Sequence, residues 1–279
     1  MRIDILIPVY NKERTIEKSV KSALAQVGCE VRVVIVDNDS KDKSAEIVER
    51  VFSEEIKNGT VVFHKNPSTV GPTQNWNVCL DFVENTYFKF LFADDILSED
   101  HCSTALKYFE QHEDLSVYSS GITYINEAGK VTGQRKYFLK GLFSYKYPLF
   151  VTLFSGNRFG APSNLIFKLT GELAEFPDDK ISGDISFIVD FLKKNKPKAY
   201  FSHTMDVLFE KGDDSITGTT KWGQEWLKKN YDLRVGITDF GKMISYLSAY
   251  MYLAVGYMFS KKYKKEINLK AILKRSADA

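Results

Sequence analysis

The sequence predicts an α/β fold in which a mostly parallel sheet is flanked by helices. Short apolar runs alternate with stretches of helical spacing over the first half of the chain, and short polar loops join them. The run at 31–36 is almost continuously β-branched, which is typical of a parallel strand covered on both faces. Strands that alternate with helices in this way indicate a parallel sheet.

The expected elements follow in order along the chain. We expect strands at 3–8, 31–36, 60–64 and 87–92, and helices at 12–25, 44–52, 71–83 and from about Ser98. Beyond about residue 115 the alternation loosens. There we expect strands at 117–124 and 200–209, a turn at 126–129, and a mostly helical stretch at 171–191 that breaks around 177–183. From 221 onward the chain becomes Tyr- and Lys-rich helix, so we divide it into a domain at 1–220 and a helical C-terminal extension at 221–279.

Composition limits the classes of function. The 279 residues contain 38 Lys and Arg against 36 Asp and Glu, and a formal charge of +2 gives no indication of a nucleic-acid partner. The three cysteines form no CxxC pair and are odd in number, which favours a reducing, cytoplasmic setting over a disulfide framework. Asp4 interrupts the first apolar run, so this run is expected to be a strand and not a signal peptide.

Two adjacent carboxylates, Asp94 and Asp95, follow the apolar run 87–92 directly. Buried neighbouring carboxylates repel each other, and a divalent cation with oxygen ligands would offset both charges. A cap of the next helix or a plain turn is the alternative at this position.

Three polar clusters are expected to meet at one edge of the sheet. They are 8–11, 37–40 and 93–95, and each follows a predicted strand. Ligands of open α/β sheets bind beyond the carboxyl ends of the strands, so this edge is the expected binding site.

Four motifs in sequence order carry a resemblance to a known family. They are Ile7-Pro8-Val9-Tyr10-Asn11, the acidic loop 36–42, the set Asn66, Gly71, Asn75 and Asn77, and Phe92-Ala93-Asp94-Asp95. With these motifs the chain resembles a family 2 glycosyltransferase of the GT-A fold, an inverting enzyme that uses a nucleotide-diphosphate sugar. The resemblance implies that 1–115 is the nucleotide-sugar-binding half and 116–220 the acceptor-binding half.

The resemblance also implies the donor site. The residues that would bind the nucleotide sugar are Pro8, Val9, Tyr10, Asn11, Asp37, Asn38, Gly71, Asn75 and Asp94. Asp95, together with Asp94, would hold Mn²⁺ or Mg²⁺, and the roles of these two neighbours are open to exchange. UDP is the favoured nucleotide, although Asn38 stands where the family commonly has a second carboxylate.

The family's usual first acid of the metal motif is Phe92 in this chain. The metal would therefore depend on the adjacent carboxylate pair and on the phosphates of the donor. We expect weak metal binding in the absence of nucleotide.

Asp184 is the candidate catalytic base, because Gly183-Asp184 resembles the family's segment in which a carboxylate at a helix start faces the acceptor. Capping of that helix is the alternative role, and the acids at 178–179 compete for the role of base. His203 is expected to be a packed or surface histidine, and Arg158 lies in a loop where it could meet an anionic group. The Gln-x-x-Arg-Trp motif of processive synthases is absent, so we expect a single transfer.

A 17-residue stretch without charge, 243–259, precedes a lysine cluster that ends at 265. It is short for a membrane span and has the aromatic and basic composition of a helix at a membrane surface. The alternative is that this helix packs on the domain or on a second subunit of a homo-oligomer.

Together these features predict a cytoplasmic glycosyltransferase, with peripheral contact to the inner face of the cell membrane as a further option. It would move a sugar to a hydroxyl of a glycan or lipid-linked acceptor in surface polysaccharide biosynthesis. The alternative is a non-catalytic GT-A module that binds nucleotide sugar or glycan, which would have no need of Asp184.

Overall fold

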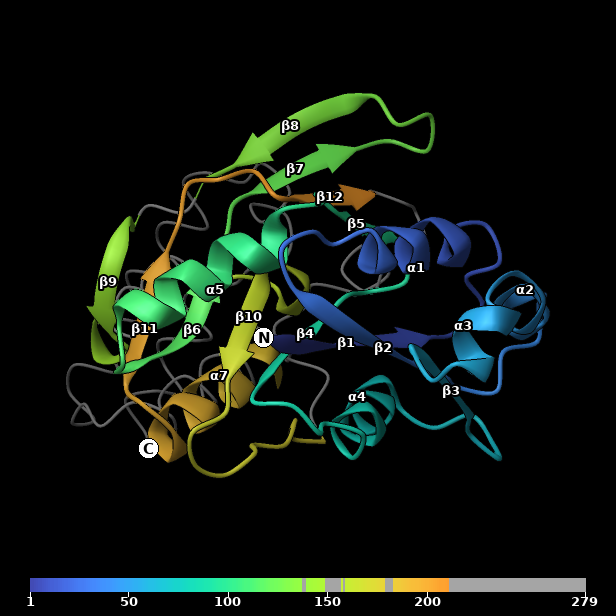
Figure 1. Ribbon diagram of the computed structural model, residues 1–279, viewed down its shortest axis with the longest axis horizontal. Coiled ribbons are helices and arrows are strands. Elements are labelled where there is room, and N and C mark those ends of the chain that lie inside the picture. Colours follow the sequence, from blue (N-terminus) through green and yellow to red (C-terminus); the bar gives the residue numbers. More distant parts are fainter. Residues whose placement is uncertain (137–138, 149–156, 158, 179–182, 211–279) are drawn as a thin grey trace, which may run out of the picture.

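Strands and helices alternate over the first 111 residues, as the sequence predicts. The computed structural model describes residues 1–136, 139–148, 157, 159–178 and 183–210 (Figure 1). The elements of this part are β1 (Arg2–Val9), α1 (Ile16–Leu24), β2 (Glu30–Asp37), α2 (Ser44–Val51), α3 (Ser53–Lys57), β3 (Val61–Lys65), α4 (Pro72–Leu80), β4 (Tyr87–Phe90), β5 (Asp95–Leu97) and α5 (His101–Gln111). The second half contains β6 (Leu115–Ser119), β7 (Ile122–Ile125), β8 (Val131–Arg135), β9 (Gly141–Ser144), the 3-10 turn η1 (Pro162–Asn164), β10 (Leu165–Lys168), α7 (Gly183–Lys194), β11 (Lys198–Phe201) and β12 (Val207–Glu210).

Among the described residues the strands form a large and a small sheet. The large sheet has the order β3-β2-β1-β4-β10-β6-β11-β9, and the small sheet has the order β5-β12-β7-β8. The strands from β3 to β4 are parallel, whereas β10 runs antiparallel to both of its neighbours. The predicted α/β class with a sheet flanked by helices is therefore confirmed, with antiparallel pairs in the second half.

Alternating side chains of the parallel strands cover two faces of the large sheet. Ile3, Ile5 and Ile7 of β1 pack in one buried cluster with α1 and α5, while Leu6 packs in a second cluster with α4 and α7. Figure 1 shows α1 and α5 above the sheet and α4 and α7 below it. This arrangement buries both faces, as a parallel sheet requires.

Two expected strands each divide between the sheets. The expected strand 117–124 becomes β6 in the large sheet and β7 in the small one, and 200–209 becomes β11 and β12 in the same way. The two segments pass from the large sheet to the small sheet side by side. Gly121 N–H donates to the Thr204 carbonyl at 2.7 Å, and Ser202 N–H donates to the Ser119 carbonyl at 2.7 Å. A Cβ on Gly121 would lie 2.9 Å from the Thr204 carbonyl oxygen, so glycine permits this close crossing.

The expected helix at 171–191 is wrong in its first part. Residues 169–178 are not helical, and α7 begins at Gly183. The side chain of Asn195 accepts the N–H groups of Thr170 and Gly171, and Asn77 accepts that of Phe176. Side-chain amides thus satisfy the backbone groups that a helix would otherwise pair. The strand expected at 87–92 also ends early, at Phe90.

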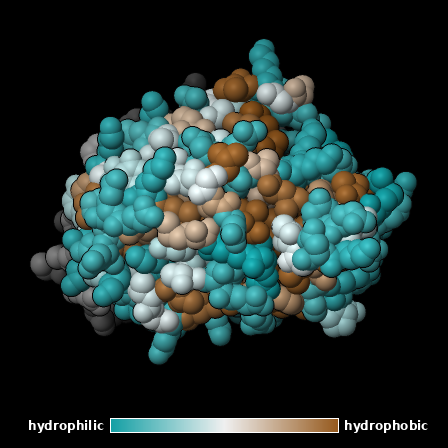
Figure 2. Space-filling view, viewed as in Figure 1, coloured by the Kyte–Doolittle hydropathy of each residue, from teal (hydrophilic) through white to brown (hydrophobic). Residues whose placement is uncertain are grey.

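The surface in Figure 2 is mostly hydrophilic, and its hydrophobic atoms form small groups divided by polar ones. Within the described ranges, no helix has both the length and the apolar character needed to cross a membrane. The C-terminal extension, including 243–265, and the domain boundary at 220 lie outside the described residues.

Candidate active site

The loops after β1, β2 and β4 meet at one edge of the large sheet, as predicted from the three polar clusters. Asn11 N–H donates to Ser40 Oγ at 3.0 Å, and its side chain accepts Lys41 N–H at 2.8 Å. Lys12 Nζ reaches Asp94 Oδ2 at 2.9 Å. Asn11 and Asp39 adopt left-handed backbone conformations with φ of 50° and 57°, which Asn and Asp tolerate better than most residues.

A pocket of about 190 Å³ opens beside these loops. Its walls are polar and carry both signs of charge, from the turn after β1, the acidic loop, the loop after β4 and the end of β12. The lining residues are Asn11, Lys12, Glu13, Arg14, Thr15, Asp42, Asp94 and Glu210.

The two neighbouring acids have different environments. Asp94 lines the pocket, and its side chain is 26% exposed in its ion pair with Lys12. Asp95 is buried at the start of β5. Burial, and then the neighbouring Asp94 carboxylate, raise the pKa of the Asp95 carboxyl well above its usual range. Asp94 is therefore the acid that solvent and ligands reach.

Asp37 presents a buried oxygen with no partner. The residue is 1% exposed at the end of β2, and its Oδ2 accepts Ser40 N–H at 3.1 Å. Its Oδ1 receives no hydrogen bond from any described residue. A buried acceptor without a donor is costly, so this atom is suited to a ligand N–H. Tyr10 directly follows β1 at the same edge of the sheet, and it is 47% exposed.

The side-chain amides of Asn38 and Asn75 are hydrogen-bonded to other residues of the chain. Asn38 Oδ1 accepts hydrogen bonds from Asn66 Nδ2 at 3.0 Å and from Val70 N–H at 2.9 Å, while Asn38 Nδ2 donates to the Val70 carbonyl. Asn66 Nδ2 also donates to Asn75 Oδ1 at 2.9 Å. These buried amides hold the loop that leads to Gly71, the residue before α4. Pro8 and Val9 are likewise buried strand residues, paired with Val36 and Asp37 of β2.

Asp184 lies in the first turn of α7, partly buried. Phe187, one turn further on, stacks on Phe176 with ring centroids 4.1 Å apart and meets Phe167 of β10 edge to face at 5.4 Å, so the helix packs against the sheet. The start of α7 also lies against the start of α4, since a Cβ built on Gly183 would meet Thr73 Cγ2 at 3.6 Å. Asn157 Nδ2 donates to Asp184 Oδ2 at 2.7 Å.

The residues present fit a divalent ion only in part. Nowhere in the described ranges do three His, Cys, Asp or Glu side chains form a group that could hold a metal ion. The partly exposed Asp94 carboxylate could supply one protein ligand, and Mg²⁺ is commonly held by one or two carboxylates plus substrate phosphates. Asp95 is less suited, because a ligand carboxyl must be deprotonated and its pKa is raised.

Comparison with known proteins decides the family. The model of the family "Glycosyl transferase family 2" matches residues 4–169, which include the loops after β1, β2 and β4 but neither Asp184 nor Glu210. The chain belongs to glycosyl transferase family 2.

This glycosyltransferase is 25% identical over 265 residues to an uncharacterized glycosyltransferase of Haemophilus influenzae. The alignment covers 94% of this chain and 98% of that protein. A UDP-Glc:alpha-D-GlcNAc-diphosphoundecaprenol beta-1,3-glucosyltransferase, WfaP of Escherichia coli, is 28% identical over 131 residues, about half of each chain. Staphylococcus aureus TarS 1–349, solved in complex with UDP-GlcNAc, superposes with a TM-score of 0.70 over 97% of this chain and 77% of that one, at 18% identity. The likeness to TarS confirms the GT-A fold.

Two basic residues of the enzyme's pocket were not predicted from the sequence. Lys12 pairs with Asp94, and Arg14 contacts Glu127 at 3.0 Å and Glu210 at 3.4 Å. Their signal was present, since basic residues follow Asn11 directly at the carboxyl end of the first strand. His203 hydrogen-bonds the Leu139 carbonyl at 3.2 Å, which fits the predicted packed histidine. Asp178 is exposed, whereas Arg158 and Asp179 lie outside the described residues.

Proposed function

We propose that this glycosyltransferase transfers a single sugar, with inversion, from a UDP-sugar to a hydroxyl of a glycan or lipid-linked acceptor in surface polysaccharide biosynthesis. The observation that carries the proposal is the pocket at the carboxyl ends of β1, β2 and β4. There the partly exposed Asp94 and Lys12 lie at the same sheet edge as the Asp37 oxygen that no described residue contacts by a hydrogen bond.

The nucleotide would bind at Asp37 and Tyr10. Asp37 Oδ1 would accept an N–H of the base, and the Tyr10 ring would stack on the base. Lys12 and Arg14 are the cations that line the pocket among the described residues, so they would contact the diphosphate. Pro8, Val9, Asn11, Asn38, Gly71 and Asn75 would shape this site through the backbone and buried amides described above.

Asp184 would act as the base. Its carboxylate accepts the proton of the acceptor hydroxyl while that oxygen attacks the anomeric carbon from the face opposite the diphosphate. The anomeric C–O bond breaks in the same step, and the electron pair leaves with UDP. A single displacement of this kind inverts the configuration at the anomeric carbon.

Mn²⁺ or Mg²⁺ would be held by Asp94 and the donor phosphates, with Asp95 buried behind it. When bound, the ion stabilises the negative charge that develops on the departing diphosphate. Lys12 would exchange its bond to Asp94 for a bond to a phosphate oxygen, so the pocket keeps its charge balance.

A lipid-linked acceptor is supported by the E. coli relative WfaP, which is named for transfer to a diphosphoundecaprenol acceptor. An acceptor of this class would place the enzyme at the inner face of the cell membrane. The basic and aromatic stretch 243–265 is the segment we propose for that contact.

A screen of nucleotide sugars by thermal shift, followed by transfer assays, tests the proposal. We expect UDP-sugars to raise the melting temperature, since a ligand that binds only the folded state stabilises it. In transfer or donor hydrolysis, Asp184→Asn should lower kcat by about 10²-fold or more with donor affinity retained. Full turnover by this variant would refute the role of base, and no shift with any nucleotide sugar would refute the donor site.

Metal dependence is tested separately by chelation. EDTA should lower the transfer rate by about 10²-fold, and Mn²⁺ or Mg²⁺ should restore it. Calorimetric titration of Mn²⁺ should show weak binding to the free enzyme and tighter binding with UDP, and Asp94→Asn should abolish that gain. A chelated enzyme that retains its full rate would show that protein cations such as Lys12 suffice.

A further inference from the structure

The short segment 159–164 is fixed on the donor-binding half of the enzyme. Ser163 Oγ accepts Phe92 N–H, two residues before Asp94, at 3.0 Å, and the Ser163 carbonyl accepts the buried Lys89 Nζ at 2.7 Å. Burial lowers the pKa of Lys89 to about 8. An ammonium group removed from water in this way is retained only where acceptors hold it, so the segment is tied firmly to β4.

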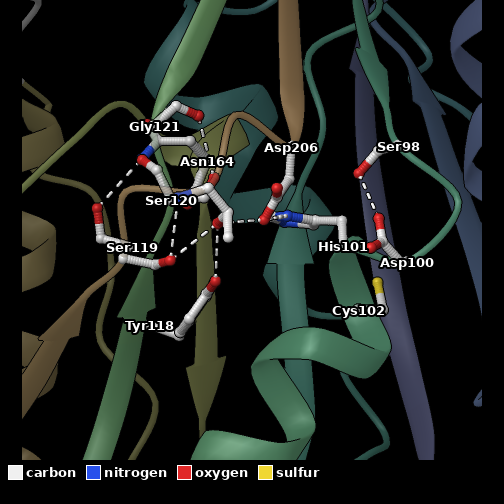
Figure 3. Close-up of polar contacts among 12 residues, drawn as sticks. Ser98, Asp100, His101, Cys102, Tyr118, Ser119, Ser120, Gly121, Asn164 and Asp206 are labelled. Atoms are coloured by element: carbon white, nitrogen blue, oxygen red, sulfur yellow. Dashed lines mark hydrogen bonds and ion pairs between the residues drawn. The ribbon is translucent and has the colours of Figure 1, made fainter. Parts of the chain in front are cut away.

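Asn164 ties the same segment to the end of β6, as Figure 3 shows. Its Nδ2 donates to the Ser120 carbonyl at 2.7 Å and to Ser119 Oγ at 3.2 Å. Its Oδ1 accepts Ala161 N–H at 2.9 Å, and Ser119 Oγ in turn donates to the Phe159 carbonyl at 2.8 Å. Both ends of the segment are therefore anchored in the sheet.

Asn157 extends from this anchored segment to Asp184. Its Oδ1 accepts the N–H groups of Phe159 at 2.9 Å and Gly160 at 3.3 Å. Two donors at one end of the amide settle its orientation, because only the oxygen can accept them. The Nδ2 group must then face the other way, where it donates to the Gly160 carbonyl at 2.8 Å and to Asp184 Oδ2 at 2.7 Å.

We propose that Asn157 is a positioning residue that holds the Asp184 carboxylate at a fixed place relative to the donor-binding strand β4. This inference rests on the proposed function, in which Asp184 takes the acceptor proton. The hydrogen bond restrains rotation of the carboxylate and favours its charged form, the form that a base requires. The guanidinium of Arg135 in β8 donates to the Asn157 carbonyl at 3.1 Å and keeps the residue in place from the other side.

Asn157→Asp separates this role from one in loop folding. The variant keeps the oxygen that accepts the two N–H groups and replaces only the donor by a second oxygen. The matched control is Asn195→Asp at the other end of α7. Asn195 also accepts two N–H groups, at 2.8 and 2.7 Å, and donates to two carbonyls, at 2.8 and 2.9 Å. Both substitutions remove a side-chain NH₂ donor from a loop, but only the NH₂ group of Asn157 is hydrogen-bonded to Asp184.

The test is the pH dependence of kcat and kcat/KM for donor hydrolysis or transfer by the full chain. We expect Asn157→Asp to lower kcat about tenfold at neutral pH with donor KM nearly unchanged. The acid limb of kcat/KM should move up by about one pH unit, because a carboxylate next to Asp184 disfavours its charged form. Asn195→Asp should keep the parent profile. An acid limb at the parent position in Asn157→Asp would overturn the proposal.

A second measurement needs no activity. The Asp184 carboxyl carbon is titrated by ¹³C NMR, and its signal is assigned by its loss in Asp184→Asn. Its pKa should rise in Asn157→Asp and stay unchanged in Asn195→Asp. An unchanged pKa in Asn157→Asp would overturn the contact itself. A raised pKa in a chain that turns over no nucleotide sugar would instead overturn the proposed function and retain the contact.

Discussion

Asp37 shows how a single atom can indicate a ligand. The carboxylate is enclosed at the end of β2, and one of its oxygens is satisfied by the Ser40 N–H of the turn that follows. The other oxygen is buried without a donor among the described residues. The resemblance to the family predicted that Asp37 binds the nucleotide sugar, and the buried oxygen without a donor is a physical reason to propose that role.

Asp37→Asn should therefore weaken UDP binding more than it weakens the fold. The amide oxygen can still accept the Ser40 N–H, but the amide nitrogen would face the ligand N–H as a second donor. We expect a loss of affinity of at least about tenfold in calorimetric titration with UDP, since hydrogen bonds to charged groups contribute about 1.5–3 kcal/mol. Asp39→Asn is the control, because it lies in the same loop at φ of 57°, which Asn tolerates. Equal losses in the two variants would argue against a direct contact with Asp37.

At the scale of elements, the segment that carries Asn164 depends on one glycine. Gly160 has φ of +123°, and a Cβ there would lie 2.7 Å from Asn164 Nδ2. Gly160→Ala should displace the Asn164 side chain and release the segment from β6, at a cost of about 1–3 kcal/mol in the free energy of unfolding. Gly141→Ala is the matched control, since Gly141 has φ of +108° and a Cβ added to it would meet nothing within 4 Å.

Denaturant unfolding and donor turnover of both variants check this expectation. Gly141→Ala should show the effect of backbone strain alone. Gly160→Ala should lose more stability and, because the segment leads to Asn157, should also lose kcat. If the two alanine variants lost the same stability and the same kcat, the close approach of Gly160 to Asn164 would contribute nothing to the free energy of unfolding.

The elements also show where sequence reasoning was sufficient. Strand and helix alternation predicted the strands β1 to β4 and the helices α1, α2 and α4 closely, because β1, β2 and β4 are largely buried and the loops between these elements are short. The pairs β6 and β7, and β11 and β12, were each predicted as one strand, because the change of sheet occurs at the Gly121 crossing, where the two segments meet. The irregular stretch before α7 was missed because distant side chains, Asn77 and Asn195, satisfy its backbone.

The candidate site was also predicted only in part from the sequence. Asp37, Asp94 and Asp184 were all proposed from motifs. Their partners were not, because Lys12 and Asn157 come to Asp94 and Asp184 only through loops 82 and 27 residues away in the sequence. The different exposure of Asp94 and Asp95 also depends on the start of β5, which no local pattern indicates.

At the scale of the whole molecule, a buried polar chain joins the two sheets, as Figure 3 shows. Tyr118 of β6 hydrogen-bonds Thr204 at 3.2 Å, and Thr204 donates to Asp206 at 2.6 Å, just before β12. Asp206 lies 3.7 Å from His101 Nδ1 at the start of α5. Burial lowers the pKa of His101 to about 4, although Asp206 opposes the shift. The joint between the sheets thus contains a histidine that is neutral at physiological pH.

This histidine should make the folded enzyme sensitive to mild acid. Because the pKa of His101 falls from its ordinary 6.5 to about 4 on folding, the unfolded chain binds the proton first as the pH drops. His101 therefore does not lower the free energy of unfolding above pH 6.5, and it lowers this free energy progressively as the pH falls from 6.5 to 4. By pH 5 this one group should cost about 2 kcal/mol in the free energy of unfolding. Denaturant unfolding at pH 7 and pH 5 should show that loss in the parent and a smaller one in His101→Leu, which has no proton to bind. Parallel losses in both proteins would place the acid sensitivity elsewhere in the molecule.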